Sequence, residues 1–149
     1  MLNINAPDAS AQLRGDAAHP GLTGAVRLYQ QAGYVLVTAH ICGLPASNAG
    51  GFFGFHIHEG TSCGGEGFAL TGGHFNPRRV LHPQHAGDLP PLLSCEGEAV
   101  MVVMTDRFSV ADVIGRTVVI HDHADDFASQ PAGNSGTKIA CGVIQSGSA

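Results

Sequence analysis

The sequence of 149 residues has few charged side chains, few aromatic ones and no tryptophan. Charged residues make up 13% of the chain and apolar residues 44%, which excludes an intrinsically disordered protein and indicates a compact globular one. The formal net charge of −5 argues against nucleic acids and anionic membrane surfaces as partners. A membrane-spanning helix is also excluded, because no segment reaches the roughly 18 consecutive apolar residues that it needs.

Two further signatures are missing from the sequence: a secretory signal at the amino terminus and the cysteine spacing of a zinc finger. The opening residues, MLNINAPDAS, have neither the basic region nor the apolar region of a secretory signal, so we expect a cytoplasmic protein. If a leader has already been removed, the expected location is the periplasm or the extracellular space. No CxxC or CxxH pair is present among Cys42, Cys63, Cys95 and Cys141, which argues against a cysteine-based zinc finger.

Short alternating segments, separated by glycine, proline and asparagine, dominate the chain and predict strands. No long helix is convincing, although 110–115 could form one helical turn. The pattern predicts an all-β protein, an antiparallel Greek-key β-sandwich or barrel of about eight strands, as a single domain over 1–149. The expected strands are 11–15, 23–30, 34–42, 52–58, 92–94, 98–105, 117–121 and 139–145.

Two stretches, 59–91 and 122–137, have no clean period and are predicted to be irregular loops. A structureless loop of about thirty residues is unusual inside a compact domain and is expected to be functional or clamped. The first of these loops contains three histidines, which suggests that a bound metal is the clamp; they are His74, His82 and His85.

Histidine is unusually abundant, since its nine copies exceed the seven lysines and arginines. His56 and His58 stand two apart in FGFHIHEG, so in a strand they point to the same side. Burying two imidazoles without partners is costly, which indicates a ligand. With His121 at the end of TVVIH and Asp88 close behind His85, the set is larger than one metal needs. Two metals that share a ligand would use it, with copper preferring an all-nitrogen set and zinc a mixed nitrogen and oxygen set.

Several motifs then agree with one family. GFHIHEG, GGHFNP, HAGDLP, GRTVVIH, ADD and GNSGTKIACGVI follow in an order that resembles the Cu,Zn superoxide dismutase family from about Ala11 to Ile144. The spacing in HEGTSC is more similar to the bacterial members. The resemblance implies an oxidoreductase that converts superoxide anion to dioxygen and hydrogen peroxide by one-electron cycling of copper, with zinc as the second cofactor.

The resemblance also implies roles for individual residues. Copper would be held by His56, His58, His74 and His121, and zinc by His74, His82, His85 and Asp88. His74 would bridge the two metals and deliver a proton, which makes it a catalytic residue. Asp125 resembles the carboxylate that links a copper histidine to a zinc histidine. Cys63 and Cys141 resemble the disulfide of the family, whereas Cys42 and Cys95 are expected to be free thiols.

Two features depart from the family pattern. Lys138 stands at the anion-guiding catalytic position that is usually arginine, and it lacks the planar fork that orients a small anion. His82 and His85 are only three apart, so one of them could be a plain loop residue. These departures leave two alternatives open: a non-catalytic copper- or zinc-binding carrier or buffer, and a copper-only dismutase with a defective zinc site.

The remaining expectations are less specific. The resemblance implies pairing, since relatives pair through different faces in different lineages, so a second copy of the chain is a candidate partner in a homodimer. Three histidines lie outside the motifs and are expected to be surface or packing residues: His19, His40 and His123.

Overall fold

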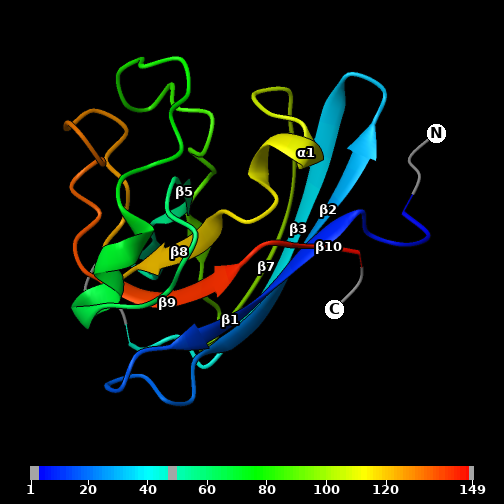
Figure 1. Ribbon diagram of the computed structural model, residues 1–149. Coiled ribbons are helices and arrows are strands. Elements are labelled where there is room, and N and C mark those ends of the chain that lie inside the picture. Colours follow the sequence, from blue (N-terminus) through cyan, green and yellow to red (C-terminus); the bar gives the residue numbers. More distant parts are fainter. Residues whose placement is uncertain (1–3, 47–49, 148–149) are drawn as a thin grey trace.

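The computed structural model describes residues 4–46 and 50–147 (Figure 1). Ten strands are present in this part of the chain, and three of them have only two residues. They are β1 (Ala9–Gly15), β2 (Thr23–Gln31), β3 (Tyr34–Cys42), β4 (Phe52–Phe53), β5 (Phe55–His58), β6 (Leu92–Leu93), β7 (Glu98–Thr105), β8 (Thr117–His121), β9 (Lys138–Val143) and β10 (Gln145–Ser146). The helical elements are a short 3-10 segment, η1 (Glu66–Thr71), and one α-helical turn, α1 (Val110–Val113).

Seven of these strands form one curled antiparallel sheet in the order β5-β8-β9-β1-β2-β3-β7, and β10 pairs with β1. β4 and β6 form a separate pair. The first three strands follow one another as a meander, but β7 returns to lie beside β3, and β9 lies beside β1. Such non-consecutive neighbours are typical of Greek-key connections. The predicted all-β antiparallel fold is therefore confirmed.

The alternation of side chains along the strands builds the core. On β3, Val35, Val37, Ala39 and Ile41 are buried, because one face of the strand points inward. On β5 and β8 the paired residues Phe55 with Ile120 and Ile57 with Val118 enter the core. The opposite face of these two strands carries histidines, and it is this face that the long loops cover.

Two predicted strands are divided in the structure, and the ambiguous segment forms the helical turn that the sequence allowed. The expected strand 52–58 is divided at Gly54, because β4 pairs with β6 whereas β5 pairs with β8. The expected strand 139–145 is divided at Ile144, whose N–H donates to the carbonyl of Arg116. The ambiguous segment 110–115 begins as a helical turn, since the Asp112 carboxylate accepts a hydrogen bond from the backbone N–H of Ser109 at 2.8 Å.

The two irregular loops lie side by side at one edge of the barrel, drawn in green and in orange in Figure 1. The first, 59–91, is not wholly irregular, because η1 lies within it. Within the described part of the chain, no helix has the length and hydropathy that a membrane crossing requires.

Candidate metal centre

Strands β5 and β8 place three histidines on one covered face. His56 and His58 alternate with core residues on β5, and His121 ends β8 at an irregularity in its pairing with β9. All three are buried, with 3% exposure or less. His58 and His121 approach each other until their Nε2 atoms are 3.1 Å apart. The strands alone therefore supply three converging imidazoles.

The first loop adds a fourth ring by pairing with the edge of β5. Ile57 donates its N–H to the carbonyl of Gly87 at 2.9 Å and accepts from Phe75 at 2.8 Å. These bonds bring His74 beside His58 and Asp88 beside His56. Glycine is needed at position 87, because a Cβ there would lie 2.1 Å from the Ile57 oxygen. The ring centroids of His56 and His74 are 4.0 Å apart as a result.

The four-histidine cluster consists of His56, His58, His74 and His121, whose nearest nitrogens all lie within 4.8 Å of one another. Hydrogen bonds fix which nitrogen of each ring is free. His58 Nδ1 lies 2.9 Å from the Gly72 carbonyl, and His121 Nδ1 lies 3.4 Å from that of Gly136. A carbonyl only accepts, so both Nδ1 atoms carry hydrogen and both Nε2 atoms present lone pairs. Two lone pairs that face each other at 3.1 Å need a cation between them.

The aspartate cluster consists of His74, His82, His85 and Asp88, again with ligand atoms within 4.8 Å of one another. His74 Nδ1 lies 2.7 Å from one carboxylate oxygen of Asp88. The Nδ1 atoms of His82 and His85 lie 3.1 and 3.3 Å from the other oxygen. The spacing of three residues between His82 and His85 thus brings both rings to the same point, and neither is a plain loop residue.

Asp125 joins the two clusters from the second loop. Its carboxylate accepts hydrogen bonds from His56 Nε2 at 2.7 Å and from His82 Nε2 at 2.8 Å. Burial opposes the ionisation of Asp125, but these two hydrogen bonds, a third from the Phe127 N–H and the proximity of His56 together outweigh it and hold its pKa below the ordinary value. Since each ring uses its Nε2 hydrogen here, each keeps a lone pair on Nδ1. Gly133, at a φ of +65°, packs so tightly against this group that a Cβ would lie 2.1 Å from the carboxylate.

One observation that does not depend on residue type indicates that these two clusters hold metal ions. Among the described residues, three buried side-chain atoms have no hydrogen-bond partner: His56 Nδ1, His74 Nε2 and His82 Nδ1. Leaving a buried polar atom unpaired costs free energy, so native structures seldom do it. All three atoms belong to the two clusters, and His74 contributes one nitrogen to each. An all-nitrogen cluster beside a mixed nitrogen and oxygen cluster matches the preferences of copper and zinc.

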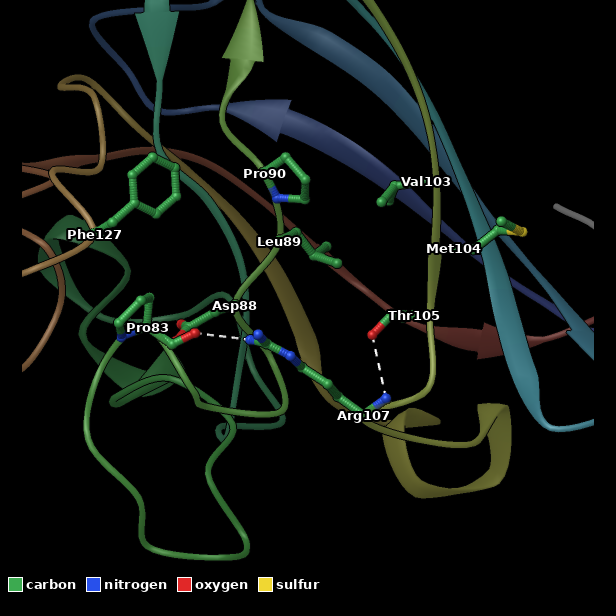
Figure 2. A pocket seen from close by; sticks show the side chains of 9 residues that line it. All are labelled: Pro83, Asp88, Leu89, Pro90, Val103, Met104, Thr105, Arg107 and Phe127. Carbon is green, nitrogen blue, oxygen red and sulfur yellow. Dashed lines mark hydrogen bonds between the residues drawn. The ribbon is translucent and has the colours of Figure 1, made fainter.

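Two residues that the sequence did not single out hold the loops in place. Arg107 follows β7, and its guanidinium donates to the carbonyl of Pro83 at 2.8 Å (Figure 2) and to that of His85 at 3.2 Å. Gln130, in the second loop, exchanges two hydrogen bonds with the backbone of His82, at 2.9 and 2.8 Å. Each of them hydrogen-bonds to a backbone segment that is distant in the sequence, so no local motif marks either residue. Both restrain the backbone that carries the aspartate cluster.

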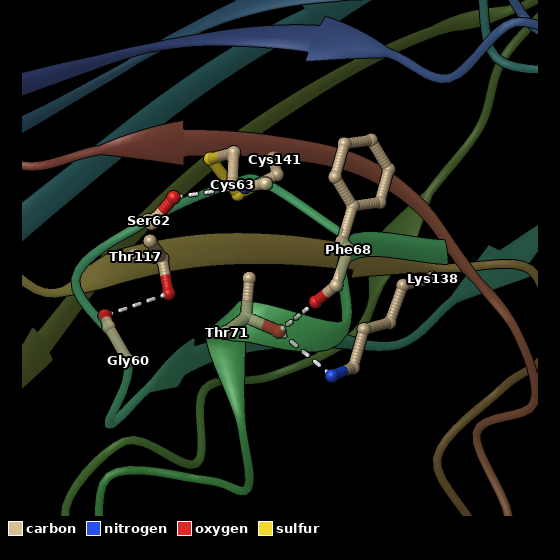
Figure 3. Close-up of a disulfide and its surroundings, with 9 residues drawn as sticks. Gly60, Ser62, Cys63, Phe68, Thr71, Thr117, Lys138 and Cys141 are labelled. Atoms are coloured by element: carbon tan, nitrogen blue, oxygen red, sulfur yellow. Dashed lines mark hydrogen bonds between the residues drawn. A yellow bond between two sulfur atoms is a disulfide. The ribbon is translucent and has the colours of Figure 1, made fainter. Parts of the chain in front are cut away.

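Lys138 lies at the start of β9, next to the first loop. Its ammonium group donates to the Thr71 hydroxyl at 2.7 Å (Figure 3) and to the Gly72 carbonyl at 2.9 Å. The Gly72 carbonyl also accepts a hydrogen bond from His58, so it links the Lys138 ammonium group to the four-histidine cluster. Burial lowers the pKa of Lys138.

The disulfide between Cys63 and Cys141 ties the first loop to β9, with the two Cα atoms 5.8 Å apart (Figure 3). Cys42 and Cys95 are free and exposed, as expected. Two histidines outside the motifs have local partners: His19 contacts Asp16, and His123 contacts Asp122. His40 is exposed, as the sequence suggests, but it contacts Glu98 on the neighbouring strand.

Burial keeps three rings of the four-histidine cluster neutral, those of His56, His58 and His121. It lowers the pKa of His58 to about 2, with a further contribution from the proximity of His121. It lowers the pKa of His121 to about 3, with a further contribution from His56. The same cause lowers the pKa values of His56 and His85. Neutral imidazole is the form that binds a metal, so these three rings can bind one without first losing a proton.

These pKa shifts predict that the metal-free protein loses stability as the pH falls from 7 to 5. In the unfolded chain His58 and His121 take up protons below their ordinary pKa of 6.5, whereas in the folded protein they stay neutral. The unfolded state then binds more protons, so the free energy of unfolding falls, by on the order of 2 kcal/mol for each ring. Asp88 and Asp125 do not contribute in this window. Their pKa values are lowered in the folded protein, so they affect stability only where the unfolded chain protonates its carboxylates, below about pH 4.

Urea denaturation of the metal-free protein at pH 7, 6 and 5 measures this effect. The double variant His58→Gln/His121→Gln, which lacks both rings, should show a smaller fall. A wild-type unfolding free energy that stays constant between pH 7 and 5 would contradict the burial of neutral rings.

Comparison with known proteins places the chain in a family. The copper/zinc superoxide dismutase family model matches residues 22–144. A Cu-Zn superoxide dismutase of Legionella pneumophila is 32% identical over 148 residues, which covers 94% of this chain and 88% of that protein. A second, from Aquifex aeolicus, is 35% identical over 137 residues and covers 82% of this chain and 78% of the relative. A superoxide dismutase-like protein of Bacillus subtilis is 36% identical over 110 residues, 64% of this chain and 56% of that protein.

The family model covers most of the chain, including both clusters, the disulfide cysteines and Lys138. Together with the antiparallel Greek-key fold, these matches show that the chain belongs to the copper/zinc superoxide dismutase family.

Proposed function

We propose that, in this copper- and zinc-dependent superoxide dismutase, the four-histidine cluster binds copper and the aspartate cluster binds zinc. The observation that carries this division is the position of His74 between the two. Its Nδ1 lies 2.7 Å from Asp88, whereas its buried Nε2 has no partner among the residues described. The bridging role expected from the sequence therefore rests on one ring that belongs to both clusters.

Copper supplies one-electron redox chemistry when bound, and zinc supplies a fixed positive charge next to it. The chain itself contributes orientation and a proton site. Because His74 Nδ1 is directed toward the aspartate cluster, Nε2 is the atom at which this ring can take up and hand on a proton while staying in place. Asp125 fixes the tautomers of His56 and His82 through their Nε2 hydrogens, which keeps both Nδ1 atoms available.

Lys138 supplies a positive charge for the superoxide anion. An ammonium group has three donors, and the described partners of Lys138 take two of them, Thr71 and Gly72. These bonds hold the charge beside the cluster, and one donor remains for a small anion. Lysine acts here as a point charge and cannot present the two parallel donors of arginine.

A Lys138→Arg variant is expected to raise kcat/KM by a factor on the order of 2 to 10, since a planar fork can orient the anion as well as attract it. The control is Lys138→Gln, which removes the charge and should lower kcat/KM and weaken its dependence on ionic strength. Steady-state superoxide consumption at matched metal content measures both. If the arginine variant gains nothing, the lysine does not guide the substrate.

The experiment that tests the whole assignment measures metal content and superoxide consumption on protein reconstituted with copper and zinc. Two metals per chain with fast turnover supports it. Tight copper binding without turnover would indicate the carrier or buffer instead. Turnover with copper alone, unaffected by the loss of zinc, would indicate a copper-only dismutase.

The disulfide favours an oxidising compartment, periplasmic or extracellular, over the cytoplasm. Disulfides persist where the redox poise is oxidising and are rare in cytosolic proteins of mesophiles. Fractionation of the producing cell, followed by detection of the protein and of its oxidised cysteines, tests this location. A homodimer stays a prediction, which sedimentation velocity of the metal-loaded protein tests.

A further inference from the structure

We propose that His40, Cys42 and Glu98 form a third metal site, on the outer surface of β3 and β7, that binds one Zn²⁺ ion. The site shares no residue with the metal centre. It rests on three side chains whose ligand atoms, a ring nitrogen, a sulfur and a carboxylate oxygen, all lie within 4.8 Å of one another.

The strand pairing brings these side chains together. His40 and Cys42 are two residues apart on β3, so both point outward while Ile41 between them is fully buried in the core. Glu98 is directly opposite Cys42 on β7, and Val100 is opposite His40. Directly opposed residues of an antiparallel pair share a face, so Glu98 is also the diagonal neighbour of His40. The backbone register thus holds the three side chains together.

The distances are close to those of a tetrahedral zinc site. His40 Nε2 lies 2.5 Å from the Glu98 carboxylate and 3.6 Å from the Cys42 sulfur. Ligands at ordinary zinc–nitrogen, zinc–oxygen and zinc–sulfur distances are about 3.4 to 3.6 Å apart around a tetrahedron. The nitrogen–sulfur pair already has this separation. The nitrogen–oxygen pair must open by less than about 1 Å, which exposed side chains can do by rotation.

The donor set selects the class of ion. Thiolate and imidazole together favour zinc over calcium or magnesium, which prefer oxygen ligands. The side chains of His40 and Glu98 are 52% and 58% exposed, so a fourth position is open to water and the ion can enter from solvent. Cys42 is a free thiol, as the site requires. Thiolate also distinguishes this site from the metal centre, whose clusters offer nitrogen and oxygen ligands.

The test uses the enzyme with its copper and zinc in place. A thiol titration first establishes that each chain has two free thiols. Added Zn²⁺ should slow the alkylation of Cys42 by iodoacetamide about tenfold or more, because a metal-bound thiolate is a poor nucleophile. Cys95 is the internal control. It is also free and exposed, and although its backbone pairs with that of Glu98, it lies outside the three-residue cluster, so its rate should change much less than that of Cys42. Peptide mass spectrometry reads both rates in the same sample.

The variants His40→Ala and Glu98→Gln should reduce the protection of Cys42, while superoxide turnover stays at the wild-type rate. Co²⁺, used in place of Zn²⁺, should add a sulfur-to-cobalt charge-transfer band that Cys42→Ser removes and Cys95→Ser retains. No slowing of Cys42 alkylation, or slowing that persists in His40→Ala, overturns the proposal. Either result would leave the assignment of the metal centre untouched, because that assignment is measured by copper and zinc at the buried clusters.

Discussion

Replacing His74 by alanine is expected to lower superoxide turnover at least about a hundredfold and to weaken the binding of both metals. The reason is that this ring is the member that the two clusters share. Its removal takes one nitrogen from the four-histidine cluster and one from the aspartate cluster. It also removes Nε2, the atom at which a proton can be held beside the reacting site.

Two control variants separate these effects. His82→Ala removes a member of the aspartate cluster alone, so zinc binding should fall while copper binding is retained. His123→Ala removes an exposed ring of the neighbouring loop that hydrogen-bonds to Asp122, so both metals and turnover should be unchanged. Metal titrations and superoxide consumption report the outcome, with far-ultraviolet circular dichroism to show that each variant folds. A His74→Ala protein that still binds both metals tightly would contradict the shared-ring arrangement.

Loss of the disulfide is the second large effect that we expect. In the double variant Cys63→Ala/Cys141→Ala the free energy of unfolding should fall by about 4.5 kcal/mol, because the bridge closes a long loop in the unfolded chain. The two cysteines are separated by 78 residues. Folded domains of this size have only about 5 to 15 kcal/mol of stability, so the variant should be marginal.

The disulfide should also matter for activity. It lies in the loop that carries η1, and Thr71 at the end of η1 accepts a hydrogen bond from Lys138. Freeing this loop should let Thr71 and Gly72 move away from the ammonium group. The matched control, Cys42→Ala/Cys95→Ala, changes two free exposed cysteines and should shift stability by about 0.5 kcal/mol or less. Urea denaturation compares the pair, and a loss below about 1 kcal/mol in the first variant would contradict this account.

Much of the fold could be predicted because the strands alternate strongly. Tyr34–Cys42, Glu98–Thr105 and Thr117–His121 have the predicted bounds, since each is rich in β-branched residues. The division of 52–58 at Gly54 could not be predicted. It depends on which strand each half pairs with, and pairing is a property of the whole sheet.

The candidate site was predictable to the extent that its residues lie in local motifs. The structure brings His56, His58, His74 and His121 together, and a family resemblance had already grouped them. Arg107 and Gln130 were missed, because a side chain that donates to a distant backbone carbonyl has no sequence pattern of its own. The cluster of His40, Cys42 and Glu98 was missed for a related reason. Its members meet only through the register of β3 and β7.

Anomalous diffraction from crystals of the copper- and zinc-loaded protein tests the central claim most directly. Data on either side of the copper and zinc absorption edges identify each metal at its own position. We predict copper among His56, His58, His121 and Nε2 of His74, and zinc among His82, His85, Asp88 and Nδ1 of the same His74 ring. A map in which the two metals do not share that ring, or in which one cluster stays empty under saturating metal, would contradict the account.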